Sequence, residues 1–294
     1  MNNMNAPKDD LETALEEASM ENKTLIIAMI NKAYVEGDNP GGMTMLDLFL
    51  EAFWLGEDTI PLLDNLLLVA VDQTSFDRCN FRRLHCYKLV TDGVDFSGEG
   101  LFMSENFVKM MWARVQFLGD ILRRGYSFIF TDTDVMWLRD PFKRLSMDED
   151  VDFQLSTDIF NGDPWSQKNL VNTGFYFVRP NNKTIALFDS WYANRNSSMN
   201  EQHMLEKMKN EGVFKQLGLK VRFMDIIHFS GFCIDSRDFN AVTTVHANCC
   251  RGVRAKVTDM IIALQDWNKY RNSTNHTMTF QWSNHSACID SWKF

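Results

Sequence analysis

The stretch YSFIFTDTDVMWLRDPF, residues 126–142, decides the fold class. It begins with a mainly aromatic and branched run that is typical of a buried β-strand. Polar and acidic residues follow abruptly in Thr131-Asp132-Thr133-Asp134. Successive side chains of an extended backbone point to opposite sides, so we expect Asp132 and Asp134 to point the same way. The stretch therefore predicts a strand that ends in two carboxylates on one face.

The flanking sequence surrounds this strand with alternating apolar runs and amphipathic segments. Strands are expected at 24–30, 65–72, 82–90, 151–157 and 174–178, and helices at 9–20, 45–53, 104–124, 185–193, 201–209 and 256–267. Such alternation is typical of βαβ units with a mostly parallel sheet, in which ligands bind at the carboxyl ends of strands. We expect a helical lead-in over residues 1–23 and one α/β domain over residues 24–290.

Composition and charge exclude several classes of protein. Hydrophobic residues make up 45% of the 294 residues and charged residues 23%, which excludes wholesale disorder, collagen and coiled coil. The net charge of -9 argues against a nucleic-acid partner, because such proteins carry a basic surface. No apolar run approaches the ~18 residues that a membrane span needs, so no membrane anchor is expected in this chain.

The two aspartates predict a cation site. Carboxylates on one face repel each other unless a divalent cation lies between them, and oxygen ligands suit Mn²⁺ or Mg²⁺, which also hold a diphosphate. The alternative is a solvated acidic turn, since an Asp-x-Asp pair occurs often by chance. The position directly after a buried strand favours the cation site.

One charged residue interrupts the apolar stripe of the helix expected at 104–124. Arg114 lies on the same face as Phe107 and Met111. A buried charge is costly unless it is paired. Arg114 is therefore either one partner of an internal salt bridge or part of an anion-binding site.

The stretch around Asp132, with LVNTGFYFVRP at 170–180 and TTVHANCCRG at 243–252, resembles plant nucleotide-diphospho-sugar transferases. The resemblance runs from about Thr24 to about Asp290 and is strongest to glycosyltransferase family 77, which includes arabinosyl- and xylosyltransferases of cell-wall extensins and pectin. It implies a GT-A fold, a single-domain α/β/α sandwich. It also implies a UDP-sugar donor, a divalent metal ion and transfer with retention of anomeric configuration.

The resemblance assigns roles in binding the donor. Asp132 would face the ribose and the metal, Asp134 would bind the metal, and His246 would complete the metal site. Without the acidic pair, a histidine beside a strand is more often structural. Arg114 would contact the donor. Asn31 and Asp72, which follow the first two strands, would frame the base and ribose unless they are only polar strand ends.

A second group of residues is assigned to the sugar. Asp158, Asn172, Thr173 and Gly174 would lie around the donor sugar, although Asn-Thr-Gly could also be only a tight turn before a strand. Glu201-Gln202 stands where relatives carry Asp-Gln, and the longer Glu201 puts its hydrogen-bond geometry in doubt. Gln202 would lie near the anomeric carbon, and Glu201 and Asp158 would assist catalysis.

Three functions remain open at this point. The favoured one is transfer of arabinose, xylose or galactose to a glycan or a hydroxyproline-rich glycoprotein. A metal-dependent phosphatase or phosphotransferase is disfavoured, because its acidic pair would follow the first strand rather than a later one. A non-catalytic homologue that binds nucleotide sugars is the third, given the change at Glu201.

Sequons and cysteines indicate a compartment. Six glycosylation sequons occur, at Asn22, Asn182, Asn196, Asn272, Asn275 and Asn284, where chance gives about three. The 6 cysteines allow about 15 pairings or six reduced thiols. Relatives are generally Golgi membrane proteins with a lumenal catalytic domain. The resemblance therefore implies the Golgi lumen, with membrane association only through an anchor that this chain lacks.

Overall fold

The structure, a computed structural model, describes residues 8–37, 42–91, 93–273 and 279–293. Its strands are β1 (Thr24–Ile30), β2 (Leu66–Ala70), β3 (His85–Lys88), β4 (Ser127–Thr131), β5 (Val135–Trp137), β6 (Phe153–Ser156), β7 (Asn172–Val178), β8 (Val221–Phe223), β9 (Phe229–Gly231) and β10 (Thr244–His246). Its α-helices are α1 (Asp10–Ala18), α2 (Lys32–Val35), α3 (Met45–Leu55), α4 (Gln73–Phe81), α5 (Glu105–Arg123), α6 (Asn182–Ala193), α7 (Glu201–Asn210), α8 (Val213–Gln216), α9 (Val253–Arg271) and α10 (Ser286–Asp290). Two short 3₁₀ helices are η2 (Ile60–Asn65) and η3 (Pro141–Lys143).

Seven strands form the central sheet, in the order β3-β2-β1-β4-β7-β6-β8. β1 pairs in parallel with β2 and β4, whereas β7 runs antiparallel to both β4 and β6. The predicted mostly parallel sheet of an α/β fold is thereby confirmed. The strand expected at 82–90 is shorter, and α4 directly before it was not predicted. Its sequence QTSFDRCNF shows little apolar periodicity, so it carried no clear helical signal.

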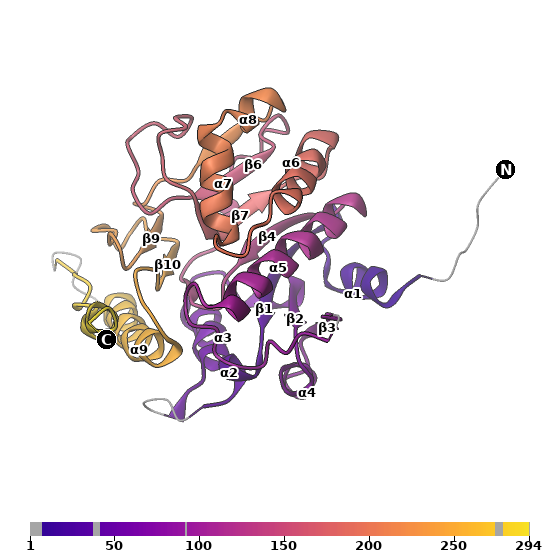
Figure 1. Ribbon diagram of the computed structural model, residues 1–294. Coiled ribbons are helices and arrows are strands. Elements are labelled where there is room, and N and C mark those ends of the chain that lie inside the picture. The colour runs from indigo at the N-terminus through magenta and orange to yellow at the C-terminus, as the bar shows by residue number, and fades with distance from the viewer. Residues whose placement is uncertain (1–7, 38–41, 92, 274–278, 294) are drawn as a thin grey trace.

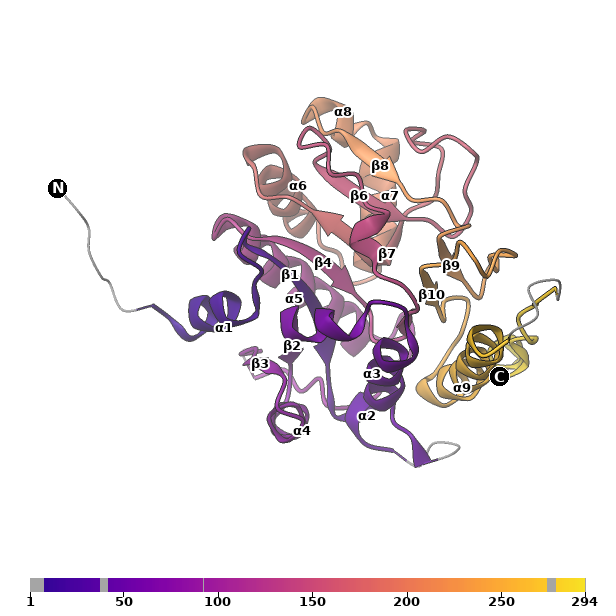
Figure 2. The same cartoon turned by 180° about the vertical axis from the view of Figure 1, so that it is seen from behind.

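Helices cover both faces of the sheet, which makes the sandwich that the resemblance implies. In β1, Leu25 and Ile27 pack in the core beneath α1, α5, α6 and α7, on the face seen in Figure 1. The alternate residues Ile26 and Ala28 pack against α3 on the opposite face, seen in Figure 2. A strand that is buried on both sides needs apolar residues at successive positions, which explains the unbroken run in its sequence.

A second, smaller layer closes the molecule at the carboxyl end of the chain. β5, β10 and β9 form a three-stranded sheet, and α9 packs outside it. α3 lies between the two units, with Phe49 facing the central sheet and Leu48 facing α9. No helix within the described part of the chain has both the length and the apolarity to cross a membrane.

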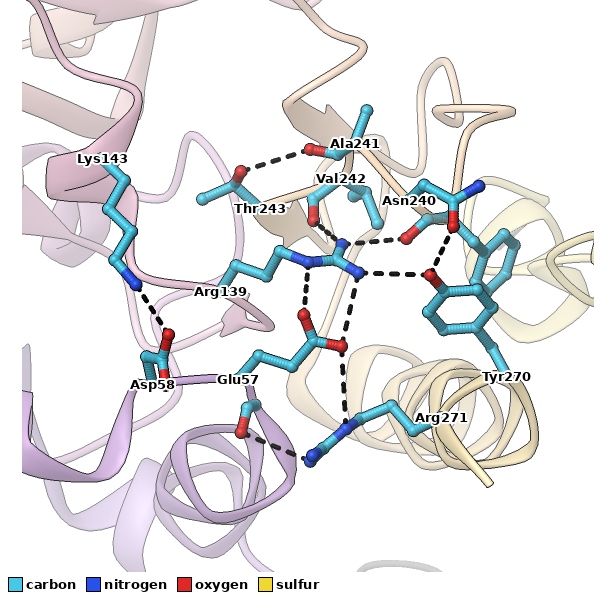
Figure 3. A network of polar contacts seen from close by, with 12 residues as sticks. Glu57, Asp58, Arg139, Lys143, Asn240, Ala241, Val242, Thr243, Tyr270 and Arg271 are labelled. Atoms are coloured by element: carbon cyan, nitrogen blue, oxygen red, sulfur yellow. Dashed lines mark hydrogen bonds and ion pairs between the residues drawn. The ribbon is translucent and has the colours of Figure 1, made fainter. Parts of the chain in front are cut away.

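Arg139, just after β5, ties this second layer to the central unit (Figure 3). Its Nε donates to Glu57 Oε2 at 2.7 Å, and its Nη1 donates to the carbonyl oxygens of Phe239 and Val242 at 2.8 and 2.6 Å. The guanidinium also lies 4.7 Å from the ring centroid of Trp267 in α9. One side chain therefore joins three segments that are distant in sequence.

All six cysteines form disulfides, which resolves the pairing that the sequence left open. The bonds join Cys79 to Cys86, Cys233 to Cys249, and Cys250 to Cys288. The last of them fastens α10 to the segment that follows β10. The Asp259 carboxylate strengthens this attachment by accepting the backbone N–H of Cys288 at 2.7 Å.

Candidate active site

The two aspartates converge through a turn rather than through strand alternation. β4 ends at Thr131, and Asp132 and Asp134 belong to the tight connection to β5. The Asp132 N–H donates to Gly174 O at 2.7 Å, and its carbonyl accepts the Val135 N–H at 3.2 Å. The expectation of an extended backbone here was wrong. The expected outcome, two carboxylates at the carboxyl end of a buried strand, is nevertheless what the turn produces.

His246 meets this acidic pair because β10 pairs with β5. The antiparallel register places His246 opposite Val135, the first residue after Asp134. The ligand atoms of Asp132, Asp134 and His246 all lie within 4.8 Å of one another. Two neighbouring aspartates and a histidine from a much later strand thus form one cluster.

Gly174 is required by the same close packing. A β-carbon added at this position would lie 2.3 Å from Cε1 of His246 and 2.9 Å from Oδ2 of Asp132. Both distances are far shorter than non-bonded contacts allow. The resemblance assigned Gly174 to the surroundings of the donor sugar, and in the structure the groups that approach its backbone are the histidine and the aspartate of the cluster.

The cluster fits a divalent cation. Oδ1 of Asp134 is buried and accepts no hydrogen bond within the described residues, and Nε2 of His246 lies 3.3 Å from it. A buried carboxylate oxygen needs a partner, and here either a protonated His246 or a cation bound by both residues would satisfy it. Carboxylate oxygens with one imidazole nitrogen are a ligand set that suits Mn²⁺, and also Mg²⁺ when water or phosphate oxygens complete the shell.

Lys256, in the second turn of α9, forms an ion pair with one aspartate of the acidic pair. Its Nζ lies 2.6 Å from Oδ2 of Asp134. Burial opposes the charged form of Asp134, but the charges of Lys256 and His246 outweigh it and lower the pKa of that carboxyl. Burial also opposes the charged form of Lys256, and the facing Asp134 carboxylate raises the pKa of the ammonium above its usual range. Asp134 is therefore ionised and Lys256 positively charged without any added ion.

Arg114 holds the opposite side of the cluster. Its side chain is 4% exposed, and Nη1 donates to Oδ1 of Asp132 at 2.8 Å while Nη2 donates to Oε1 of Glu201. Although burial disfavours a charged guanidinium, Glu201 and Asp132 raise the pKa of Arg114. The salt bridge expected as one alternative is present. It does not exclude anion binding, because Arg114 also lines the cleft described below.

Glu201 and Gln202 begin α7 and reach the strand that carries the Asn-Thr-Gly sequence. Oε1 of Glu201 accepts the Thr173 hydroxyl at 2.9 Å, and Oε1 of Gln202 accepts the Thr173 N–H at 3.1 Å. The second carboxylate oxygen of Glu201, Oε2, is buried and accepts no hydrogen bond among the described residues. The longer side chain at position 201 therefore reaches both Arg114 and Thr173.

Amide groups surround Asp158. Its Oδ1 accepts from Nδ2 of Asn172 and from Nδ2 of Asn248, each at 2.7 Å. Oδ1 of Asn248 in turn accepts the Cys233 N–H at 3.0 Å, and Oδ1 of Asn172 accepts the Gly174 N–H at 2.9 Å. The three polar side chains of Asp158, Asn172 and Asn248 thus make a continuous network beside the acidic cluster.

A cleft with a volume of about 300 Å³ brings these groups together. The predicted residues that line it are Asn31, Arg114, Asp132, Asp134, Asp158, Asn172, Thr173, Glu201, Gln202 and His246. Asn31 is also a structural anchor, because its Nδ2 donates to the carbonyl oxygens of Phe96 and Gly98 at 2.9 and 3.0 Å.

Asp72 does not line this cleft. Its Oδ2 accepts the Lys32 N–H at 2.6 Å and its Oδ1 accepts the Ser75 N–H at 2.8 Å, so its two oxygens fix the start of α2 and the start of α4. We therefore leave Asp72 out of the proposed site.

Other lining residues were not predicted from the sequence. Lys256, Asn248 and Tyr34 all contribute to the cleft wall. Lys256 was expected only as the start of a helix, and Asn248 carried no signal beyond its place in VHANCC. The one usable signal for Lys256 was its place one turn into a helix that follows the candidate metal ligand His246, and that signal is weak.

Comparison with known proteins gives matches over much of the chain. The profile of the family described as nucleotide-diphospho-sugar transferase matches residues 61–260. An uncharacterized protein of Arabidopsis thaliana is 54% identical over 290 residues, which cover 97% of this chain and 85% of the relative. The arabinosyltransferase RRA2 of Arabidopsis thaliana is 27% identical over 146 residues, 43% of this chain and 33% of the relative. Among solved structures, the galactosyltransferase LgtC with donor and acceptor sugar analogues aligns with a TM-score of 0.48 at 12% identity, over 85% of this chain and 97% of LgtC.

Proposed function

Because the chain belongs to the nucleotide-diphospho-sugar transferase family and is therefore a glycosyltransferase that uses a nucleotide sugar, we propose that its donor is a UDP-sugar and its acceptor a plant cell-wall glycan or hydroxyproline-rich glycoprotein. The sugar would be arabinose, xylose or galactose. The observation that carries the proposal is the meeting of an acidic cluster with two cationic side chains, the buried Arg114 and the partly buried Lys256, in one cleft.

Asp132, Asp134 and His246 would hold Mn²⁺ or Mg²⁺. When bound, such an ion supplies a Lewis acid that stabilises negative charge on the departing diphosphate. The protein contributes fixed ligands: the β4–β5 turn orients the carboxylates, and Gly174 leaves room for the imidazole ring. Because these groups are already positioned, little reorganisation is needed on binding.

Arg114 and Lys256 would bind the diphosphate from two sides. Arg114 contacts Asp132, Lys256 contacts Asp134, and both line the cleft, so their charges reach a phosphate that occupies it. Glu201 keeps the guanidinium of Arg114 in place by a buried ion pair. We therefore assign Glu201 a positioning role. The shorter aspartate of relatives is not needed for that role, because Glu201 reaches Arg114 directly.

Asp158, Asn172 and Gln202 would orient the donor sugar. We propose retention, with the acceptor hydroxyl attacking on the face that the diphosphate leaves. Two carboxylates near the proposed sugar position are already engaged: Asp158 by two amides, and Glu201 by Arg114 and Thr173. Each is held through one oxygen only, Oδ1 of Asp158 and Oε1 of Glu201, so trapping of a covalent glycosyl-enzyme would distinguish double displacement from same-face attack. Same-face attack needs only that the acceptor proton can pass to the departing phosphate oxygen.

The test is UDP release by the purified chain. UDP-arabinofuranose, UDP-xylose and UDP-galactose are each incubated with and without Mn²⁺, and UDP is quantified. Release from one of them that needs Mn²⁺ supports the proposal, and NMR of the anomer of the free sugar that forms first then reports retention or inversion. Phosphate release from simple phosphoesters instead would point to a phosphatase. Tight binding of a UDP-sugar without any turnover would identify a non-catalytic homologue.

We also propose that the protein acts in the Golgi lumen. Three disulfides are typical of proteins that fold in an oxidising compartment. Among the sequon asparagines, Asn22, Asn182, Asn196, Asn272 and Asn284 are exposed, whereas Asn275 lies outside the described residues. A mobility shift of the plant-expressed protein after treatment with a peptide N-glycosidase tests this proposal. A protein without glycans and with six free thiols would contradict it.

A further inference from the structure

Two aromatic rings stand half-exposed at the wall of the cleft. Phe102 precedes α5 and is 41% exposed, and Trp292 follows α10 and is 51% exposed. Both line the cleft, and their ring centroids are 6.5 Å apart. Large aromatic surfaces in contact with water are unfavourable, and where they gather they commonly mark a binding surface. These two come from segments almost two hundred residues apart in sequence, so local chain geometry does not account for their meeting.

Trp292 is fixed in place by several contacts. Its Nε1 donates to the carbonyl oxygen of Cys249 at 2.8 Å, and the guanidinium of Arg251 lies 5.4 Å from the ring centroid. The helix before it is tied to the cleft wall by the disulfide between Cys250 and Cys288. An exposed ring that already has these contacts loses less rotational freedom when a ligand binds, which lowers the entropic cost of binding.

Phe102 is held by its neighbours and by the segment around it. Its ring packs edge-on against Phe107, with centroids 5.6 Å apart, and approaches His203 at 6.3 Å. Glu99 fastens the same segment to α9, because its Oε1 accepts the Val253 N–H at 2.6 Å. The two aromatic rings are thus parts of one wall.

The other parts of the cleft already suit the donor. Arg114, Asp134 and Lys256 provide the charges that a diphosphate and its cation need. Apolar side chains at the ends of β1 and β2 and on α5 suit a nucleobase: Met29, Val71, Met110 and Met111. These residues account for the diphosphate, the cation and the nucleobase, so no such part of the nucleotide sugar remains for Phe102 and Trp292 to bind.

We propose that Phe102 and Trp292 form an acceptor subsite, which stacks against the C–H face of a neutral saccharide ring. This inference rests on the proposed glycosyltransfer and extends it to the acceptor. A sugar ring has an apolar C–H face and an outward belt of hydroxyls. Aromatic surface therefore binds the face, and the hydroxyls stay available to water and to the reaction. The two rings bind by stacking and carry no charge, so they do not favour an acidic sugar over a neutral one.

The experiment measures acceptor and donor binding separately. Saturation-transfer difference NMR is recorded for methyl β-L-arabinofuranoside, methyl α-L-fucopyranoside and methyl β-D-galactopyranoside, in the presence of UDP and Mn²⁺. Calorimetry gives the Kd of UDP with Mn²⁺. The variants are Phe102→Leu and Trp292→Leu, with Phe102→Tyr and Trp292→Phe as ring-preserving variants. Phe81→Leu and Trp54→Leu are matched controls, because these rings are 78% and 58% exposed and lie outside the cleft.

We expect at least one glycoside to receive saturation on its C–H protons, with a Kd that rises roughly 2- to 10-fold in each leucine variant. The ring-preserving variants, the two controls and the Kd of UDP should stay near the wild-type values. The proposal is overturned if no glycoside binds, if the leucine variants bind as well as the controls, or if UDP binding weakens in parallel, which would assign the rings to the nucleobase. Failure of the wild type to bind UDP would instead remove the proposed function itself.

Discussion

Arg114 and Arg139 are both largely buried arginines, yet their surroundings differ in one respect. Arg139 meets Glu57, two backbone carbonyls and the Tyr270 hydroxyl (Figure 3). Arg114 meets two carboxylates, Asp132 and Glu201. Around Arg114, Glu201 and the adjacent Asp134 each retain a buried carboxylate oxygen without a hydrogen-bond partner in the described chain.

The difference separates a scaffold network from a site. Nearly all buried polar groups of folded proteins are hydrogen-bonded, so those that remain unpartnered need another explanation, such as a ligand. The Arg139 network joins the second layer to the central unit with mostly neutral acceptors and has no spare oxygen among those unpartnered atoms. The Arg114 region gathers three carboxylates and the cations Arg114 and Lys256 beside a cleft, and two of its carboxylate oxygens stay without a hydrogen bond, which is the arrangement that a metal ion and an anionic donor would complete.

The largest effect is expected from Asp134→Asn. Removing one charged ligand should lower Mn²⁺-dependent UDP release by at least ~100-fold. It should also abolish the rise in Tm that Mn²⁺ with UDP produces in the wild type. Circular dichroism confirms that the variant is folded.

Asp152→Asn is the matched control for this change. Asp152 is equally buried, but its carboxylate is fully used by Lys183, Asn181 and the Lys220 N–H. It should lose stability and keep its UDP release per folded molecule. If Asp134→Asn and Asp152→Asn reduce release alike, unpartnered oxygens do not mark the site.

Arg139→Met should lower stability and leave donor binding unchanged, the opposite of the result expected for Asp134→Asn. Removing the guanidinium leaves the Phe239 and Val242 carbonyls and one side of Glu57 without donors, which should lower the free energy of unfolding by about 2–3 kcal/mol. Urea denaturation measures this change. The Kd of Mn²⁺ with UDP should stay within about twofold of the wild type, since Arg139 does not line the cleft. A stable variant with impaired donor binding would contradict the assignment of this network to the scaffold.

Gly174→Ala tests the packing inside the cluster. The added methyl group would overlap His246 and Asp132, so one of them must move. We expect about 1–3 kcal/mol of lost stability and a weaker response to Mn²⁺, by roughly 10-fold in affinity. Thermal unfolding at increasing Mn²⁺ concentration gives both quantities. Gly98→Ala, where no atom lies within 4 Å of the added carbon, should change neither.

The fold can be predicted from the sequence more fully than the site, for physical reasons. β1 and β4 are predictable because a strand buried on two faces must be apolar throughout, and Arg114 stands out because a charge on an apolar stripe needs a partner. The convergence of Asp132 and Asp134 was expected for the wrong reason, since a turn and not the strand brings them together. His246 entered by resemblance, and its geometry depends on a strand pairing that no local pattern reveals.

Other features depend on tertiary structure alone. Lys256 reaches Asp134 only because α9 packs beside the β4–β5 turn. The disulfide between Cys250 and Cys288 was one of many pairings that spacing could not separate. The meeting of Phe102 with Trp292 requires both the 95–104 segment and α10 to lie at one cleft, and neither sequence suggests the other.

The smallest effect is expected at the margin of the Arg139 network, from Lys143→Ala. Nζ of Lys143 lies 2.6 Å from Oδ2 of Asp58, and Figure 3 shows this pair beside the network. Both side chains are largely exposed, so water screens the attraction and ordering two mobile chains offsets it. The hydrogen bond and charge of Lys143 lower the pKa of Asp58, so any stabilisation is present at neutral pH and disappears as the pH falls through that lowered pKa. We expect no resolvable change in Tm at neutral pH, in contrast to Arg139→Met. A loss as large as that of Arg139→Met would mean that charge pairing itself stabilises this face. The value of the Arg139 network would then not come from its buried, fully partnered guanidinium.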